Sequence, residues 1–243
     1  MNTSATTGPQ SSRVAVITGG LGALGTAVIN GFMQAGYRVA VVDRMPPDAP
    51  AAAAWRTKPD VLVLAGVDLA DAAATQAALQ AAATRHGGID VLVNVAGGFR
   101  WQKLNDGDLE IWDSMFAANL RSAAAACRAA LPYLRGSAMG RIVNIGAGAA
   151  AGRSTAGMGA YAASKAGVHK LTESLADELK SHGITVNAVL PGTIDTPQNR
   201  ADMPDADRAL WVTPQDVANV ILFLASESAR AVTGALVPVN GRG

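Results

Sequence analysis

The segment that decides the fold lies near the N-terminus and reads Val14-Ala15-Val16-Ile17-Thr18-Gly19-Gly20-Leu21-Gly22-Ala23-Leu24-Gly25. Its apolar half predicts a strand, and a helix over residues 24–35 follows the glycine turn. Glycines let the backbone approach a ligand closely, and the free N–H groups at a helix start suit a pyrophosphate. A tight turn without a ligand is the alternative. However, a second apolar strand over 37–42 ends in Asp43, at the distance expected of a ribose-binding acid.

Apolar runs and helical patterns alternate along the whole chain. The predicted strands cover about 13–18, 37–42, 61–66, 89–94, 141–146, 184–190 and 235–239. This alternation predicts an α/β fold with a doubly wound parallel sheet, a Rossmann fold. No linker interrupts it, so we expect one catalytic domain over 13–243 after a polar, flexible tail over 1–12.

Composition excludes several classes of function. Hydrophobic residues make up 49% and charged residues 16% of the 243 residues, and the formal net charge is +1. Neither a nucleic-acid footprint nor an anionic-membrane surface is indicated. No apolar stretch is long enough to span a bilayer, and residues 1–12 lack the apolar core of a signal peptide. We therefore expect a soluble cytoplasmic protein that acts on a small-molecule substrate.

Cysteine and histidine give no sign of a metal site. Cys127 is the single cysteine, so an internal disulfide is excluded, and its Ala-rich surroundings predict a core position. His86, His169 and His182 have no metal-ligand spacing among themselves or with Cys127. We expect these histidines at the surface or at helix ends, and no bound metal.

Tyr161 and Lys165 stand four residues apart and therefore share one face of a helix. A phenol has a pKa of about 10, and a fixed cation beside it favours the anion. Lys165 is therefore expected to lower the pKa of Tyr161, which could then exchange a proton with a carbonyl oxygen. The same spacing also occurs on solvated helix faces, so the neighbouring motifs must decide between these readings.

Short motifs follow one another along the chain in a fixed order: Thr18-Gly19-x-x-x-Ala23-x-Gly25, Asp68-Leu69, Asn94-Val95-Ala96-Gly97, Asn119, Tyr161 with Lys165, and Pro191-Gly192-Thr193-Ile194-Asp195-Thr196. In this order they resemble the short-chain dehydrogenase/reductase family over nearly all of the chain after residue 12. Ala23 departs from the family's middle glycine and leaves the turn intact.

The resemblance implies an NAD(P)-dependent oxidoreductase that transfers a hydride between nicotinamide C4 and a small carbonyl or alcohol substrate. Tyr161 would exchange the proton, Lys165 would also hold the nicotinamide ribose, and Asn119 would anchor a water linked to Lys165. Alternatively, Asn119 is bonded to nearby backbone. The residues implied in cofactor binding are Gly19, Leu21, Gly22, Ala23, Leu24, Gly25, Asp43, Arg44, Asp68, Leu69, Asn94, Ala96, Gly97, Tyr161, Lys165, Pro191, Gly192, Thr193, Ile194 and Thr196.

The choice between NAD(H) and NADP(H) depends on two neighbouring residues. The Asp43 carboxylate can accept bonds from a ribose hydroxyl and would repel a 2′-phosphate, which favours NAD(H). Arg44 could tolerate that phosphate or stack on adenine, so NADP(H) stays possible.

The family's catalytic serine is missing from its expected place. Residues 141–145 run into Gly146-Ala147-Gly148, and either alignment puts Ala147 or Gly148 at the serine position. Ser154 and Thr155 in the following loop could substitute. Losing one preorganised donor to a developing oxyanion costs about 2.7–4 kcal/mol, so an ordinary ketone should react slowly unless another group replaces it.

This absence points to a narrower resemblance, to the dihydropteridine reductases of the same family. The matching segments are Val95-Ala96-Gly97-Gly98, Gly157-Met158, Ala166-Gly167-Val168-His169 and much of 190–211. A quinonoid pterin is an activated acceptor and depends less on an oxyanion donor. Asn94 and Asn119 instead follow the broader family. A third hypothesis is a non-catalytic dinucleotide-binding sensor, against which the retained Tyr161, Lys165 and Asn119 argue.

Further segments bear on substrate and assembly. Residues 198–212, with Pro204 and Trp211, are predicted to form a mobile lid over the substrate. Phe99 and Trp101 follow a strand end, where they could line a substrate pocket or pack in a core or interface. The family resemblance implies a homo-oligomer, a tetramer or a dimer, formed through the Ala-rich helices that carry Asn119 and Tyr161.

Overall fold

The computed structural model describes residues 12–152 and 155–242. Within these ranges the strands form one parallel seven-stranded sheet in the order β3-β2-β1-β4-β5-β6-β7. The strands are β1 (Val14–Thr18), β2 (Arg38–Asp43), β3 (Val61–Ala65), β4 (Val91–Asn94), β5 (Arg141–Ile145), β6 (Thr185–Pro191) and β7 (Leu236–Val239). The predicted doubly wound α/β fold is confirmed. Apart from Ser12, the tail predicted over 1–12 lies outside the described residues.

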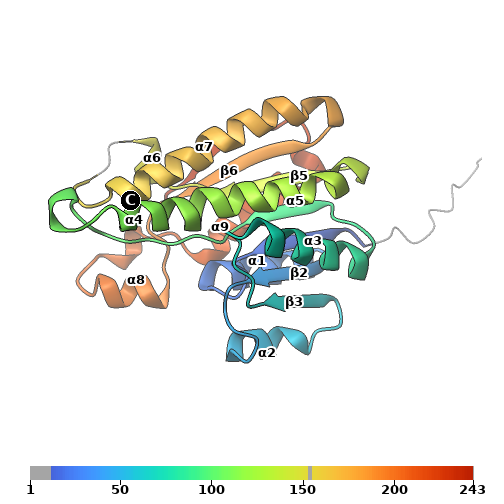
Figure 1. Cartoon of the computed structure of the whole chain (residues 1–243), viewed down its shortest axis with the longest axis horizontal. Helices are drawn as coiled ribbons and strands as arrows, with labels where there is room; N and C mark the ends of the chain where they lie inside the picture. The colour runs from blue at the N-terminus through green and yellow to red at the C-terminus, as the bar shows by residue number, and fades with distance from the viewer. Residues whose placement is uncertain (1–11, 153–154, 243) are drawn as a thin grey trace, which may run out of the picture.

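Helices cover both faces of this sheet (Figure 1). Helices α1, α2 and α9 share a core with one face, and α3, α5 and α7 share a core with the other. The α-helices are α1 (Ala23–Gln34), α2 (Pro50–Arg56), α3 (Ala72–His86), α4 (Glu110–Met115), α5 (Ser122–Gly136), α6 (Gly148–Ala151), α7 (Gly159–Leu179), α8 (Pro197–Asp202) and α9 (Pro214–Ala225). The shorter elements are η1 (Leu104–Asp106), the π-helix η2 (Phe116–Arg121), η3 (Lys180–His182), η4 (Arg208–Leu210) and η5 (Glu227–Ala229).

The central strands are apolar at successive positions because both of their faces are covered. In β1, Ala15 and Ile17 pack into the core with α1 and α9, whereas Val16 packs into the core with α3 and α5. All three are fully buried. Burial on both faces explains why β1 reads as an unbroken apolar run rather than an alternating one. None of the described helices combines the length and apolar character needed to span a bilayer.

The sheet reverses its order between β1 and β4, which are neighbours although β2 and β3 come between them in sequence. Ligands of open α/β sheets bind outside the carboxyl ends of the strands at such a switch point. In Figure 1 this edge lies on the left, where α4, α6 and α8 gather with the end of the chain. The predicted motifs, although far apart in sequence, end at this edge.

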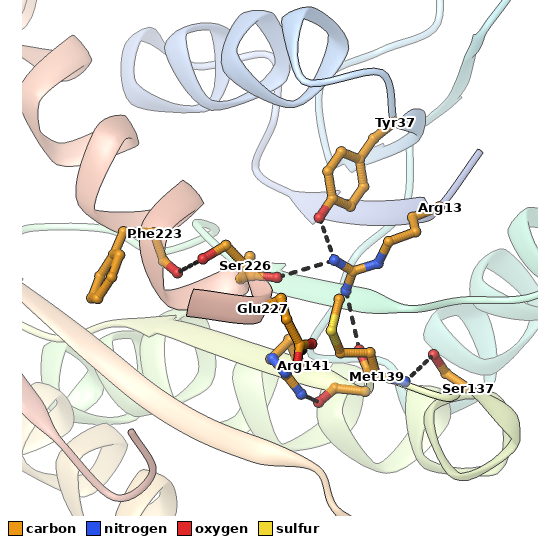
Figure 2. A network of polar contacts seen from close by, with 10 residues as sticks. Arg13, Tyr37, Ser137, Met139, Arg141, Phe223, Ser226 and Glu227 are labelled. Carbon is orange, nitrogen blue, oxygen red and sulfur yellow. Dashed lines mark hydrogen bonds and ion pairs between the residues drawn. The ribbon is translucent and has the colours of Figure 1, made fainter. Parts of the chain in front are cut away.

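At the opposite edge of the sheet, arginine side chains form polar contacts between segments that are distant in the sequence (Figure 2). Arg13 donates to the Tyr37 hydroxyl at 2.6 Å and to the Met139 carbonyl at 3.1 Å. Arg141, buried at the start of β5, lies 3.9 Å from the Glu227 carboxylate. These contacts join β1, β5 and the segment after α9 at the edge remote from the switch point.

Candidate active site

The β1–α1 turn has the conformation that its glycines predict. Gly19 has a φ of +64°, and a Cβ there would lie 2.6 Å from Ala96 Cα. A Cβ on Gly25 would lie 2.4 Å from the Gly19 carbonyl oxygen. Gly22 precedes α1, and no described side chain caps this helix. The N–H groups of its first turn are therefore available to an anion, as a pyrophosphate-binding turn requires.

Asp43 lies beside this turn at the end of β2. Its Oδ2 accepts a hydrogen bond from the Leu21 N–H at 3.0 Å, and its Oδ1 accepts one from the Met45 N–H at 2.9 Å. The carboxylate is buried, whereas Arg44 is exposed. The backbone thus fixes the Asp43 side chain against the glycine turn, whereas Arg44 points to the surface.

Two further predicted cofactor residues lie on the loop after β3. Leu69 is buried, and Asp68 is exposed with its carboxylate accepting a bond from the Ala70 N–H at 2.9 Å. This loop leaves the sheet at the same edge as the glycine turn, two strands away from β1.

Asn94 differs from its predicted role as a cofactor contact. Its side-chain amide donates to Asn144 Oδ1 at 2.8 Å and to Cys127 Sγ at 3.2 Å, inside the protein. Only the Asn94 backbone therefore lies at the strand end. Cys127 is buried as expected, and burial raises the pKa of its thiol to about 12.

The loop after β4 meets η2 and α7 at Gly97. A Cβ on Gly97 would lie 2.6 Å from Asn119 Oδ1 and 3.3 Å from Lys165 Nζ. Asn119 Oδ1 accepts from the Gly98 N–H at 2.9 Å, and Nδ2 donates to the Gly98 carbonyl at 3.1 Å and to Ser164 Oγ at 2.9 Å. The Asn119 side chain therefore forms hydrogen bonds with backbone, as the alternative interpretation predicted. The bonded residue is Gly98, on the loop after β4 rather than on the helix of Asn119.

Lys165 and Tyr161 are on α7, as their spacing predicts. Lys165 is buried, and its Nζ donates to the Ile145 carbonyl at 2.8 Å. Burial lowers the pKa of Lys165 to about 8 and raises the pKa of Tyr161 to about 12. The expectation that Lys165 lowers the pKa of Tyr161 is therefore wrong in this structure, because burial dominates. Tyr161 is a neutral phenol at pH 7, able to donate a proton.

Aromatic side chains surround Tyr161 on the side of the β4 loop. The ring of Phe99 meets the Tyr161 ring edge-on, with centroids 5.0 Å apart and an interplanar angle of 82°. Trp101 Nε1 donates to the Ala156 carbonyl at 3.0 Å, so this loop is attached to the segment before α7. The Tyr161 hydroxyl has no hydrogen-bond partner in the described part of the chain. Phe99 thus lies at the site rather than in the core.

No hydroxyl side chain occupies the strand end that follows β5. Ala147 is buried and precedes α6, which begins at Gly148. Of the substitutes considered above, Ser154 lies outside the described residues. Thr155 is exposed and lines a cavity of about 290 Å³ together with Trp112 and Gly159. Gly159, which lines this cavity, is the first residue of α7 and lies two residues before Tyr161 in the sequence.

The segment that follows β6 also lies at the edge of the sheet where the strands have their carboxyl ends. Pro191 ends β6, and the Gly192 N–H donates to the Val239 carbonyl at 3.0 Å. The predicted lid contains α8 and η4, and Thr196 caps α8 by accepting from the Asn199 N–H at 3.1 Å. The base of the lid is a parallel bridge between Ile194 and Val212, with the Val212 N–H donating to the Thr193 carbonyl at 2.9 Å.

One of the histidines is not where the sequence predicted it. His86 lies at the end of α3, as expected, and is buried, whereas His169 is buried in the middle of α7. His182 is exposed, as expected. Among the described residues, no group of three or more histidine, cysteine or acidic side chains could hold a metal ion. The sequence reasoning also missed Ser164, although its position three residues after Tyr161 could have indicated it.

Comparison with known proteins shows the family of this chain. The model of the short chain dehydrogenase family matches residues 13–207. The 2-(R)-hydroxypropyl-CoM dehydrogenase of Xanthobacter autotrophicus is 36% identical, covering 95% of this chain and 98% of that protein. Galactitol 2-dehydrogenase of Rhizobium johnstonii is 39% identical, covering 93% of each chain. A solved short-chain dehydrogenase/reductase from Serratia marcescens superposes with a TM-score of 0.84 at 31% identity, covering 96% of this chain and 98% of that one. This chain therefore belongs to the short-chain dehydrogenase/reductase family and is an NAD(P)-dependent oxidoreductase.

Proposed function

We propose that this oxidoreductase uses NAD(H) to interconvert a small secondary alcohol and its ketone, with Tyr161 as the acid/base group. The observation that carries the proposal is the position of Tyr161 and buried Lys165 at the sheet edge that also holds the glycine turn and Asp43. The names of two relatives, a hydroxypropyl-CoM dehydrogenase and a galactitol dehydrogenase, support alcohol or carbonyl substrates.

The described residues divide the work of binding and proton transfer. A bound nicotinamide would supply or take up the hydride. The N–H groups of the first turn of α1 would hold the pyrophosphate. Tyr161, neutral at pH 7, would give its proton to the substrate oxygen in reduction, and the nearby Lys165 cation would stabilise the resulting phenolate. The bonds from Asn119 to Gly98 support a positioning role for Asn119 on the loop that carries Phe99.

The preference for NAD(H) is supported by the fixed position of Asp43. Its carboxylate is buried, accepts a bond from the Leu21 N–H and would repel a 2′-phosphate, whereas Arg44 is exposed. We expect wild-type protein to bind NADH more tightly than NADPH by fluorescence titration. Asp43→Asn keeps the size of the side chain but removes its charge and should narrow this difference, while Arg44→Ala should widen it. Equal binding of both cofactors by wild type would contradict the preference.

A second candidate substrate is a quinonoid pterin. It is favoured by the lack of a hydroxyl side chain at residues 146–148, because an activated acceptor depends less on a donor there. The two candidates are separated by Ala147→Ser. A ketone reductase should gain rate from the new hydroxyl, and a quinonoid reductase should not.

The decisive experiment measures NADH oxidation with a panel of small ketones, 3-oxoacyl thioesters and a freshly generated quinonoid dihydropterin. Tyr161→Phe removes only the hydroxyl and should lower turnover by about 10²–10⁴-fold while NADH binding is kept. Unchanged turnover in this variant would refute the role of Tyr161. Absence of turnover in wild type on every substrate would favour the sensor hypothesis.

Assembly and location complete the proposal. We propose a cytoplasmic homotetramer in which the domain over 13–243 associates through the helices that carry Asn119 and Tyr161. The exposure of Leu109 and Phe116 beside this surface supports association there. Light scattering after size exclusion should give four times the chain mass, and Phe116→Glu should lower it. A monomer in wild type would contradict the proposal.

A further inference from the structure

One face of α7 carries three functional groups at a spacing of four residues. Tyr161, Lys165 and His169 are separated by one helical turn each, so their side chains follow one another along the same face. Lys165 and His169 are 5% and 4% exposed, respectively. The first two belong to the proposed proton transfer, and His169 has no role in it so far.

The His169 ring bonds the strand end that faces the site. The Ala147 N–H donates to His169 Nε2 at 3.3 Å, and Lys165 Nζ donates to the Ile145 carbonyl at 2.8 Å. Two successive residues of this helix face thus hold the backbone on both sides of Gly146. A Cβ on Gly146 would lie 2.4 Å from His169 Nε2, so the ring fills the space that a side chain there would need.

The direction of the Ala147 bond fixes the protonation of the imidazole. A backbone N–H can only donate, so His169 Nε2 must be unprotonated, and in the neutral ring Nδ1 carries the proton. Protonation of Nε2 would place two N–H groups against each other. It would also create a second cation one helical turn from Lys165.

Among the residues that the structure describes, the charged groups that act on His169 belong to its own helix. Lys165, Lys170 and Glu173 provide them, while burial is the largest cause that lowers the pKa of His169. The strand ends beside the ring contribute uncharged groups: the Ala147 N–H bonds the ring, and a Cβ on Gly146 would lie near both His169 and the Leu190 side chain of β6. The neutral ring is therefore favoured, and the charged ring is disfavoured by Lys165.

We propose that His169 is a positioning residue, which holds residues 145–148 beside Lys165 and Tyr161 and, when protonated, releases them and ends turnover at acid pH. The proposal rests on the proposed role of Tyr161. Because Ala147 or Gly148 occupies the position where the family carries serine, the His169 bond to Ala147 also fixes the backbone that borders the substrate oxygen.

Two substitutions separate the two properties of the His169 ring, its ability to accept a hydrogen bond and its ability to gain a proton. His169→Gln retains an oxygen that can accept from the Ala147 N–H but cannot gain a proton near neutral pH, and His169→Leu retains neither property. Because burial lowers the pKa of His169, we expect the kcat/KM of wild type to fall only at a pH below the ordinary histidine pKa. His169→Gln should keep its rate at least about one pH unit further into the acid range. His169→Leu should be about tenfold slower in kcat than wild type near neutral pH, where the wild-type bond is intact, since one lost hydrogen bond of about 1.4 kcal/mol corresponds to that factor.

The matched control is His182→Gln, because His182 is exposed and lies after α7. It should leave the pH profile unchanged. An acid limb that is identical in wild type and His169→Gln would overturn the proposal, and so would full activity of His169→Leu.

A measurement without substrate keeps this proposal distinct from the proposed function. Nitrogen-15 NMR of histidine-labelled protein should show an unprotonated Nε2 for His169 at pH 7.5, assigned by its absence in His169→Gln. Its titration midpoint should coincide with the acid limb of turnover. A protonated Nε2 at that pH would overturn the proposal even if turnover depends on Tyr161. Full turnover of Tyr161→Phe would instead refute the proposed function while leaving the NMR result intact.

Discussion

Replacing Gly97 by Ala tests whether the β4 loop, η2 and α7 are packed as tightly as the structure indicates. The added Cβ would lie 2.6 Å from Asn119 Oδ1 and 3.3 Å from Lys165 Nζ. Asn119 cannot turn away freely, since its side chain makes two hydrogen bonds with Gly98 and one with Ser164. The methyl group must therefore displace Asn119 or bend the loop.

The expected cost follows from these contacts. Overpacking a well-packed site costs about 1–3 kcal/mol, and each hydrogen bond lost by a displaced Asn119 adds about 0.5–1.5 kcal/mol. We therefore expect Gly97→Ala to lower the free energy of unfolding by about 2–4 kcal/mol. At about 2–4 °C per kcal/mol for a chain of this size, Tm should fall by about 4–16 °C. Because a shift of about 1 Å in a catalytic group can cost 10²-fold, kcat should fall about a hundredfold.

The assay is urea unfolding and steady-state turnover of Gly97→Ala beside Gly98→Ala. A Cβ on Gly98 would meet Met115 Cε at 3.7 Å and Ala118 Cβ at 3.8 Å, which are ordinary contacts. Gly98→Ala should therefore be neutral or stabilising by about 0.4–1 kcal/mol.

A double variant shows whether the Asn119 oxygen is the obstacle. In an Asn119→Ala background the methyl group of Gly97→Ala has room, so its added cost in unfolding free energy should drop by at least about 1 kcal/mol. Equal stability of the two single glycine variants, or an unchanged cost in that background, would refute the packing argument.

Three further changes test other parts of the structure. Since the pKa of Lys165 is lowered to about 8 from 10.5, the folded state binds fewer protons than the unfolded state between these values, and wild type should gain stability over Lys165→Met as the pH rises from 8 to 10.5. A constant difference in urea titrations across this interval would contradict the burial of the ammonium group. Cys127, with a thiol pKa raised to about 12, should react with Ellman's reagent only in denaturant, and rapid labelling of native protein would show that it is accessible. Asp71→Ala removes the cap that accepts from the Ala73 and Ala74 N–H groups and should cost about 0.5–2 kcal/mol of stability, whereas Asp71→Asn should cost little and neither should alter NADH binding.

The sheet could be predicted from the sequence because both of its faces are covered. Burial on both sides demands unbroken apolar runs, and these runs end at glycine, asparagine or proline motifs. The predicted strand over 89–94 corresponds to β4 at Val91–Asn94, and the one over 37–42 corresponds to β2 at Arg38–Asp43. The parallel sheet and the expectation of a single domain follow from the same alternation of strands and helices, whereas the order of the strands comes from the structure.

The side chains of the site were harder to predict because their surroundings come from distant segments. The spacing of Tyr161 and Lys165 predicted that they share one helix face. It did not predict that Tyr161 is buried, and this burial raises the pKa of Tyr161 instead of lowering it. The motif around Asn94 gave the strand end but not the inward turn of its amide toward Cys127. For His169 the four-residue spacing from Lys165 was visible in the sequence, yet its bond to the strand end depends on the absence of a side chain at Gly146.

The base of the lid has a consequence for how this scaffold can diversify. Residues 195–211 leave and rejoin the domain at one point, where Ile194 pairs with Val212. The internal bonds of the segment, such as Arg200 to Asp195, stay within it, and its contact with the chain end is made through the backbone around Gly241. Because the two ends of this segment lie side by side, the segment can be replaced by another of different length without changing the register of the sheet or the glycine turn. If the segment acts as the predicted lid, grafting the corresponding segment of a relative onto Ile194 and Val212, with Thr196 kept, should change which substrates bind while preserving the sheet and the glycine turn.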